Sequence, residues 1–300
     1  MSFTFTNEAG VELDLDDGSD YEVRRWSGIG APDLSVQTFQ RYNRPGSVIR
    51  RASLPARQVL VSMWVKGTSE ADCDGNMDAL LSHLAGSYGR NEPRFGLLKY
   101  TRSDASVRSL RCIVAGGLGR DESQYVTPVL RSIGVMFLAD HPSWYDATEQ
   151  SVDLTIGTTL DVVFPLDLPH TFGLDGQSAG VSLSYTGTAE TRSLLWQVPG
   201  PSVAPALINV TTGESLKFSN LTVPEGLTLK VRMGWRPDGV RDIRAYLDDG
   251  FGGETSVMGY LDSGSRFVRL DPGTNVLEVA QTNEAATVHT LKHFREYLAA

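Results

Sequence analysis

The second half of the chain holds short strand-like segments with no helical pattern between them, and this limits the folds open to it. From about residue 149 onward, turn sequences such as 212–214, 224–226 and 271–273 separate short apolar runs. Strands at a spacing of roughly 8–12 residues, without intervening helices, are typical of a β-sandwich or jelly roll. The strands expected here are 151–156, 160–164, 181–185, 194–198, 206–209, 216–218, 227–231, 243–246, 265–270, 275–279 and 286–291.

The first half combines similar strands with one helix. Residues 58–66 and 129–139 alternate apolar and polar side chains, as half-buried strands do. Residues 37–47 are rich in Arg, Asn, Pro and Gly and predict an extended, exposed loop. Further strands are expected at 3–5, 11–15, 21–23, 95–101 and 106–115.

The helix is predicted from about residue 69. Ser69 suits the N-cap, and acidic residues fill the first turn, where the helix dipole favours them. Gly75 weakens the middle of the pattern, so a start near Asp74 is the alternative, and Gly86 and Gly89 end it. The buried stripe is expected to contain Met77, Leu80, Leu81 and Leu84.

The length predicts two domains, because 300 residues is about twice a typical single domain. We expect a mainly β protein. Residues 1–150 form an α+β domain, a β-sandwich with one helix, and residues 181–300 form a jelly-roll β-sandwich. Residues 151–180 are expected to hold a linker and the first strands of the second domain.

Charge and hydropathy exclude several classes of protein. The chain has 27 Lys and Arg against 36 Asp and Glu, a net charge of −9, which repels phosphate and argues against a dedicated nucleic-acid binder. Two cysteines are too few for a disulfide scaffold or a four-cysteine zinc site. The first residues lack the features of a signal peptide, and no apolar run approaches the ~18 residues of a membrane span. We therefore expect a soluble protein made in a cytoplasm.

The histidines predict no metal site. His289 and His293 are four residues apart and would share one face of a helix, but their β-branched neighbours favour a strand. On a strand the two side chains would share a face about 13 Å apart. His83 is expected on a helix face, and His141 and His170 lie beside prolines in expected turns.

Nucleophile and phosphate motifs are also missing. Cys73 lies among acidic residues, which raise the pKa of a thiol, and Cys112 alternates within a strand as a small core residue. Residues 116–120 (GGLGR) lack the P-loop ending and predict a β-turn. The acidic run 14–20 (DLDDGSD) is shorter than an EF-hand loop, so a solvated turn is preferred to calcium binding. We expect no enzyme, and no catalytic, cofactor-binding or metal-binding residues.

Three segments of the first half carry a family resemblance. Residues 135–146 (VMFLADHPSWYD) resemble the F-x-A-D-D-P-x-W-Y ending of the N-terminal domain in siphophage distal tail proteins, the Dit-like phage tail components. His141 stands where Asp is commoner. Residues 28–32 (GIGAP) and the strand–helix unit at 58–88 follow the order of the same domain.

The second half continues this resemblance. Residues 187–191 (GTAET), 198–201 (VPGP) and 209–216 (NVTTGESL) look like the opening of the family's C-terminal domain. Residues 270–275 (LDPGTN) match its recurrent L-x-P-G-x-N. Ser193 begins a Ser-Leu-Leu where the family usually has a proline. The order and spacing of these segments carry the resemblance, which spans nearly the whole chain.

The resemblance implies a structural role at a virion tail tip. Distal tail proteins form a hexameric ring through the N-terminal domain, here residues 1–150, and DNA passes through its channel. The implied partners are five further copies in a homo-hexamer, the tail tube protein, the baseplate hub or tail-associated protein, the tape measure protein and a receptor-binding protein. The protein is assembled in the bacterial host cytoplasm, without a membrane. Residues 181–300 correspond to a galectin-like sandwich, but the galectin sugar-binding patterns do not occur in this sequence.

Physical arguments fit this role and leave alternatives open. An extended loop at 33–52 suits embracing a neighbour across the heterologous interface of a ring. The acidic balance is compatible with a negative channel that DNA passes without sticking. A carbohydrate-binding accessory protein of the tail tip is the alternative function and would show an exposed aromatic groove. A cell-wall hydrolase would need paired carboxylates or a metal triad. The particle could be a phage, a gene-transfer particle or a tail-like bacteriocin.

Overall fold

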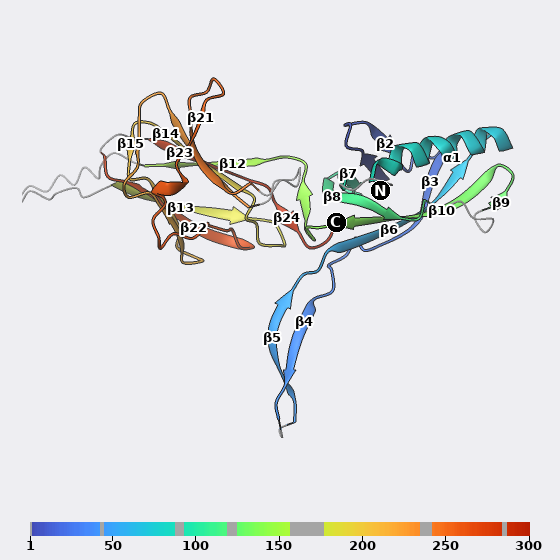
Figure 1. Cartoon of the computed structure of the whole chain (residues 1–300), viewed down its shortest axis with the longest axis horizontal. Coiled ribbons are helices and arrows are strands. Elements are labelled where there is room, and N and C mark those ends of the chain that lie inside the picture. Colours follow the sequence, from blue (N-terminus) through green and yellow to red (C-terminus); the bar gives the residue numbers. More distant parts are fainter. Residues whose placement is uncertain are drawn as a thin grey trace, which may run out of the picture. The chain divides into compact units, whose positions relative to one another are not determined.

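The chain forms two compact units. The computed structural model describes residues 2–42, 45–87, 93–118, 125–156, 177–234, 242–283 and 287–300. The first unit contains residues up to Ala147 and takes in Tyr297–Ala300 as well, while the second begins at Thr148 and ends at Glu296. The chain therefore leaves the first unit after Ala147 and returns to it after Glu296 (Figure 1).

The first unit is built around one large antiparallel sheet. Its strands run in the order β2-β1-β7-β8-β10-β6-β3, with β9 beside β10, β11 beside β8 and β24 beside β11. These strands are β1 (Ser2–Thr6), β2 (Glu12–Asp14), β3 (Tyr21–Ser27), β6 (Arg57–Lys66), β7 (Gly96–Thr101), β8 (Val107–Gly116), β9 (Tyr125–Thr127), β10 (Leu130–Ala139), β11 (Trp144–Asp146) and β24 (Glu296–Tyr297).

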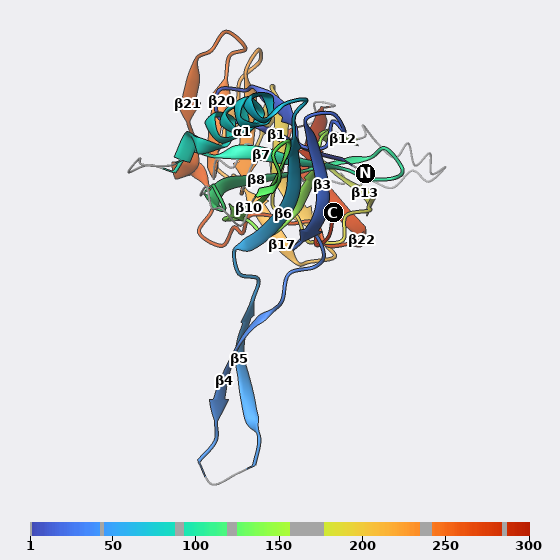
Figure 2. The same cartoon turned by 90° about the vertical axis from the view of Figure 1, so that its right-hand side faces the viewer.

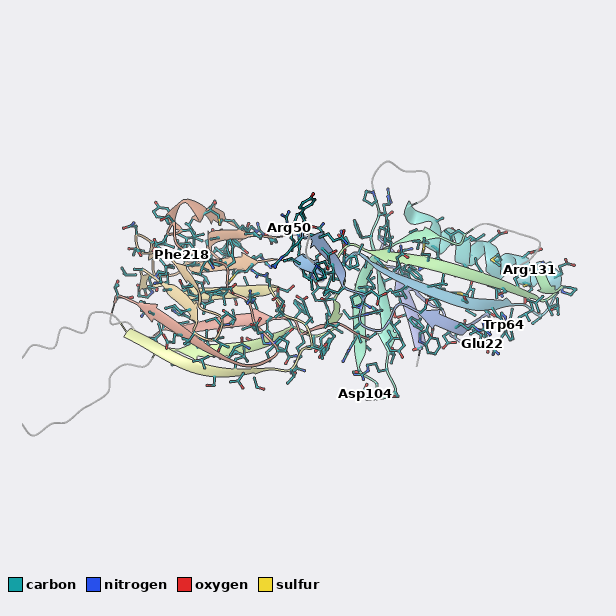
Figure 3. The ribbon with its side chains drawn as sticks, turned by 90° about the horizontal axis from the view of Figure 1, so that it is seen from below. Glu22, Arg50, Trp64, Asp104, Arg131 and Phe218 are labelled. Carbon is teal, nitrogen blue, oxygen red and sulfur yellow. The ribbon has the colours of Figure 1, made fainter. Side chains whose placement is uncertain are left out.

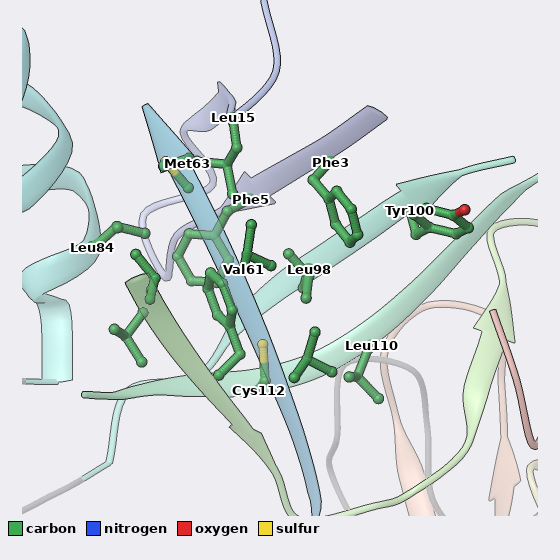
Figure 4. Packing of buried hydrophobic residues seen from close by; sticks show 14 of the residues in the cluster. Phe3, Phe5, Leu15, Val61, Met63, Leu84, Leu98, Tyr100, Leu110 and Cys112 are labelled. Atoms are coloured by element: carbon green, nitrogen blue, oxygen red, sulfur yellow. The ribbon is translucent and has the colours of Figure 1, made fainter. Parts of the chain in front are cut away.

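The alternating sequences form the central strands, as predicted. β6 and β10 pair along their whole length, and every second residue of each is buried. Glu22 and Trp64, which lie opposite each other in β3 and β6, are on the outer face of this sheet (Figure 3). The inner face forms the core, where Phe3, Phe5 and Leu98 pack together (Figure 4).

The helix α1 (Glu70–Leu84) closes this core. The side chain of Ser69 accepts a hydrogen bond from the backbone N–H of Asp72 at 3.2 Å, so the predicted N-cap is confirmed. The alternative start near Asp74 is wrong, because the cap and the first-turn acids offset the cost of Gly75. The short 3₁₀ turn η1 (Ala85–Ser87) follows, and Gly89 lies outside the described residues. The buried face consists of Cys73, Met77, Leu80 and Leu84.

The second unit is a β-sandwich. One sheet has the order β12-β23-β14-β19-β20-β21 and the other has the order β13-β22-β16-β17. The strands β15 and β18 form a separate two-stranded pair. Trp196, Leu291, Leu207 and Leu277 come from both sheets and share one core. The elements are β12 (Gln150–Thr155), β13 (Gln177–Tyr185), β14 (Leu194–Pro199), β15 (Ser202–Val203), β16 (Ala206–Asn209), β17 (Glu214–Lys217), β18 (Thr222–Val223), β19 (Thr228–Met233), β20 (Arg244–Asp248), β21 (Glu254–Ser256), β22 (Gly273–Gln281), β23 (Val288–His293) and the 3₁₀ turn η3 (Met258–Tyr260).

The predicted fold class is confirmed, with two local corrections. The chain is mainly β, with one α-helix among the described residues. The extended, exposed loop predicted at 37–47 is wrong only at its ends, which are exposed as expected but pair as β4 (Ser35–Gln40) and β5 (Ser47–Ser53). The strand predicted at 265–270 is also wrong: the Arg266 N–H donates to the Ser215 carbonyl, Leu270 forms an isolated β-bridge with Thr191 through two backbone bonds, and the segment forms no ladder. The strand predicted at 160–164 lies outside the described residues.

Candidate assembly surface

The hairpin β4–β5 pairs with no other strand of the described chain. Phe39 lies opposite Val48 in the register, and a bulge interrupts the pairing between Gln37 and Thr38. We call residues 33–54 the arm. Figures 1 and 2 both draw this two-stranded ribbon extending away from the sheets of the first unit.

The arm and its base expose apolar side chains. Among the described residues, 17 large hydrophobic side chains are exposed, and eight of them lie between residues 26 and 60. Soluble monomers usually scatter such residues singly, so a concentration of this kind marks an interaction surface. The eight are Trp26, Leu34, Val36, Phe39, Tyr42, Ile49, Leu54 and Leu60.

The arm is also cationic, although the chain is acidic. Residues 33–54 contain four arginines and one acidic residue, whereas the whole chain has a net charge of −9. The Arg50 guanidinium lies 4.7 Å from the centre of the Phe39 ring, a cation–π contact on the arm's own surface. The arm therefore suits an apolar partner surface with acidic groups at its rim.

An isolated two-stranded ribbon is marginally stable in water. All six residues of β4 are exposed, and β5 has only Val48 partly buried. Covering Phe39, Tyr42 or Ile49 would contribute about 1.5–3 kcal/mol each from removal of apolar surface from water.

The segments that carried the resemblance in the second half build its interior. Asn209 is fully buried; its amide donates to the carbonyl of Arg269 at 2.7 Å and to Oδ1 of Asn275 at 3.1 Å. Its Oδ1 accepts from the backbone N–H of Thr211 at 3.0 Å. Segments 209–216 and 270–275 are therefore joined through two buried amides, which satisfy the turns on both sides.

The segment 135–146 has a similar role in the first unit. Trp144 is fully buried in its core, and the Tyr145 hydroxyl lies 2.9 Å from Nδ1 of His141. Burial lowers the pKa of His141 to about 4, so the ring is neutral at ordinary pH. The Tyr297 hydroxyl donates to the Asp146 carboxylate at 3.2 Å. This segment serves the packing of the first unit.

The two histidines weighed as metal ligands lie on strand β23, as predicted, and both face the core. His289 packs 5.6 Å from the Trp196 ring and His293 5.8 Å from the Tyr185 ring, measured between ring centres. Neither ring nitrogen of His289 has a hydrogen-bond partner among the described residues. Burial lowers the pKa of each imidazole to about 4. Their environment is apolar packing.

The other candidates are structural as well. Cys73 and Cys112 are buried free thiols, and burial raises the pKa of both, that of Cys112 to about 12. In the acidic run, Asp17 accepts from the backbone N–H of Ser19, Asp20 and Tyr21, each at 2.9 Å, which is the expected turn. His83 lies on the helix as predicted, with Nε2 3.0 Å from the Phe5 carbonyl. His170 and residues 119–120 lie outside the described residues.

Within the described part of the chain, no group of three or more His, Cys, Asp or Glu side chains could hold a metal ion. None of the helices described there combines the length and hydropathy of a membrane-spanning helix. The large aromatic residues exposed in the described part of the second unit are Phe251, at the β20–β21 tip, and Tyr260, in η3. They lie on different elements and do not line a sheet face.

Comparison with solved structures identifies this architecture. No protein-family model and no curated protein matches the sequence. The crystal structure of SPP1 Dit, described as a paradigm of the hub adsorption apparatus in phages infecting Gram-positive bacteria, matches 97% of this chain and 98% of its own, with a TM-score of 0.62 and 18% identity. The chain has the Dit fold. A chain of the phage P2 baseplate in its activated conformation with Ca matches 100% of this chain and 99% of its own, with a TM-score of 0.50 and 12% identity.

The Dit fold confirms the predicted resemblance at the level of architecture over nearly the whole chain. The arm's pairing was missed because Arg, Asn, Pro and Gly dominate its tip, and these residues favour loops. Its apolar residues gave a usable signal: Val36, Phe39, Val48 and Ile49 are β-formers in a stretch otherwise assigned to a polar loop.

Proposed function

We propose that this chain is a structural protein of a phage or phage-like tail tip. Its ring joins the tail tube to the baseplate hub or tail fibre and lets DNA pass. The Dit fold, shared with a hub adsorption protein and a baseplate chain, supports this role.

The exposed arm is the observation that carries the proposal. A ring subunit needs two different complementary surfaces, one for each neighbour, so that rotation closes the assembly. The arm supplies one surface, apolar and cationic, and the neighbouring first unit supplies the other. Six copies complete the ring through the first unit.

The second unit serves as a docking platform in this proposal. Its β-sandwich has a core of its own, separate from that of the first unit, so it can carry partners without disturbing the ring. We assign it the contacts with the hub and with a receptor-binding protein. The tail tube and tape measure proteins meet the ring formed by the first unit, at the virion tail tip.

Acidic and basic side chains are distributed unequally between the two halves of the chain. Residues 1–147 hold 18 acidic and 16 basic side chains, while residues 148–300 hold 18 acidic and 11 basic. The acidic excess belongs mainly to the second unit, so the net charge of the chain does not by itself make the channel negative. Passage of DNA rests on the ring and on which side chains line it.

The arm can be tested directly. The double variant Phe39→Ser and Ile49→Ser removes exposed apolar surface, so it leaves folding unchanged and should weaken self-association at least roughly tenfold. Gln37→Ser, also exposed in β4, is the matched control and should associate like the parent chain. Analytical ultracentrifugation over a wide concentration range measures both. Unchanged association of the double variant would remove the arm from the interface.

A further inference from the structure

The two ends of the arm meet at one buried arginine. Arg57, 2% exposed, is the first residue of β6 and follows β5 closely along the chain. Its Nη1 donates to the carbonyl oxygens of Gly28 at 2.7 Å and Gly30 at 2.6 Å, in the loop just before β4. One side chain thus links the segment that enters the arm with the segment that leaves it.

The remaining donors of the same guanidinium reach two segments far away in sequence. Nε donates to the carbonyl of Pro142 at 2.5 Å, and Nη2 donates to the carbonyl of Leu298 at 2.6 Å. Leu298 lies in residues 297–300, which we call the return segment because they rejoin the first unit after the chain has formed the second. The backbone N–H of Ala300 donates to the carbonyl of Ile29 at 2.9 Å. The return segment and Arg57 therefore hold the same loop.

The loop and the return segment are fixed in turn. Gly28 has a φ of +83°, and a Cβ there would lie 1.9 Å from the carbonyl oxygen of Gln58, so only glycine allows this approach to β6. The return segment is held by Arg108 of β8. Its guanidinium donates to the carbonyl of Ala299 and lies 3.6 Å from the centre of the Tyr297 ring. The loop at 28–30 and the return segment are therefore each fixed by contacts that do not involve the arm.

The chemistry of Arg57 requires an arginine. No ion pair joins it to a carboxylate of the described residues; backbone carbonyls compensate its charge instead. Burial lowers its pKa to about 10, so it stays charged at neutral pH. A planar guanidinium has five N–H donors in a fixed fork, whereas a lysine ammonium could not reach four separate carbonyls at once.

We propose that Arg57 and the return segment form a clamp that sets the direction in which the arm leaves the first unit. The clamp rests on the proposed function, in which the arm contacts a neighbouring copy. An arm held in one direction loses less conformational freedom on association than a swinging one, so clamping favours assembly. Arg57 is a positioning residue here, and residues 297–300 become part of the assembly apparatus.

Distances between two spin labels test the clamp without requiring assembly. Nitroxides are attached at Tyr42→Cys, near the arm tip, and at Ser82→Cys, exposed on α1; the native Cys73 and Cys112 are buried and do not react. Pulsed electron–electron double resonance on the dilute protein measures the width of the distribution of distances between the two nitroxides. The parent chain should give a narrow distribution and Arg57→Lys one roughly twofold wider.

Two further variants make the test decisive. Deletion of residues 298–300 removes the Leu298 carbonyl and the Ala300 N–H and should widen the distribution as Arg57→Lys does, even if Arg57→Lys fails to fold. Arg131→Lys is the matched control, a second buried arginine of the first unit, whose Nη2 donates to Asp74 at 3.1 Å. It should leave the distribution narrow.

The outcomes separate the clamp from the proposed function. Unchanged distributions in Arg57→Lys and in the deletion would overturn the clamp, and so would equal widening in Arg131→Lys, since that reports general loosening. Wider distributions together with a parent chain that never forms rings would support the clamp and overturn the ring. With both intact, the two clamp variants should also assemble several-fold more weakly than Arg131→Lys.

Discussion

At the scale of single residues, buried amides and imidazoles contribute to the stability of the second unit. Asn209 replaces water as the partner of backbone groups in two segments: it donates to the Arg269 carbonyl at 2.7 Å and accepts from the Thr211 N–H at 3.0 Å. His289 and His293 fill core positions with polar rings kept neutral by burial. The two kinds of residue make different predictions.

Asn209→Ala should destabilise the second unit by about 2–4 kcal/mol, because buried donors and acceptors in both turns lose their partners. Urea unfolding of the whole chain, followed through the buried Trp196, measures the free energy. Asn220→Ala, at an exposed position, is the control and should change it by less than about 0.5 kcal/mol. Equal small effects from both variants would show that the buried amides do not hold the turns.

Acid should destabilise the same unit through His289. The pKa of this imidazole falls from 6.5 to about 4 on folding, so the unfolded chain binds the extra proton first. The stability is fully present above pH 6.5 and is lost as the pH falls from 6.5 towards 4, by roughly 3 kcal/mol for this residue. His289→Leu should remove that part of the pH dependence, measured by urea unfolding at both pH values. If the free energy of unfolding of His289→Leu depended on pH as that of the parent chain does, burial of His289 would not be the cause of the pH dependence.

At the scale of elements, alternation and capping made the sheets and the helix predictable. β6 and β10 were predicted from their period of two, and α1 from its N-cap and apolar stripe. Residues 265–270 show the limit of such patterns: Val268 and Leu270 fill core positions two residues apart, although the backbone forms no ladder. Alternating burial shows which face of a segment points into the core. Whether the segment pairs as a strand depends on a neighbouring strand, which the pattern does not identify.

The arm's strands and the return segment were missed for a related reason. The arm's strands have no buried face, so hydrophobic alternation gives no sign of them. The return segment depends on contacts between residues far apart in sequence, such as Arg57 and Leu298. The candidate site was foreseen as an exposed stretch that meets a neighbour, and its structure and anchoring were not.

Ser69→Ala should cost the first unit about 1 kcal/mol, because the N-cap hydroxyl that accepts from the Asp72 N–H is lost. Thermal unfolding of the variant against the parent chain measures the loss. Ser82→Ala, exposed on the same helix, is the control and should have a small effect. A neutral Ser69→Ala would mean that the packing of α1 against the sheet alone sets where the helix begins.

At the scale of the whole molecule, function depends on charge placement and assembly. The assembled protein should not retain duplex DNA at an ionic strength of about 0.15 M, because residues 1–147, which form the proposed ring, hold 18 acidic and 16 basic side chains and so present no net positive charge to DNA. Fluorescence anisotropy of a labelled duplex measures binding. Retention that disappears at high salt, and with Arg41, Arg50 and Arg51 changed to Gln, would show instead that the arm holds DNA.

The central claim is the closed ring, and electron microscopy of the purified chain over a wide concentration range tests it most directly. The account predicts six-fold rings with an open centre, lost in the Phe39→Ser and Ile49→Ser double variant and kept in Gln37→Ser. Particles that remain single copies at every concentration, or rings that the double variant forms equally well, would contradict it.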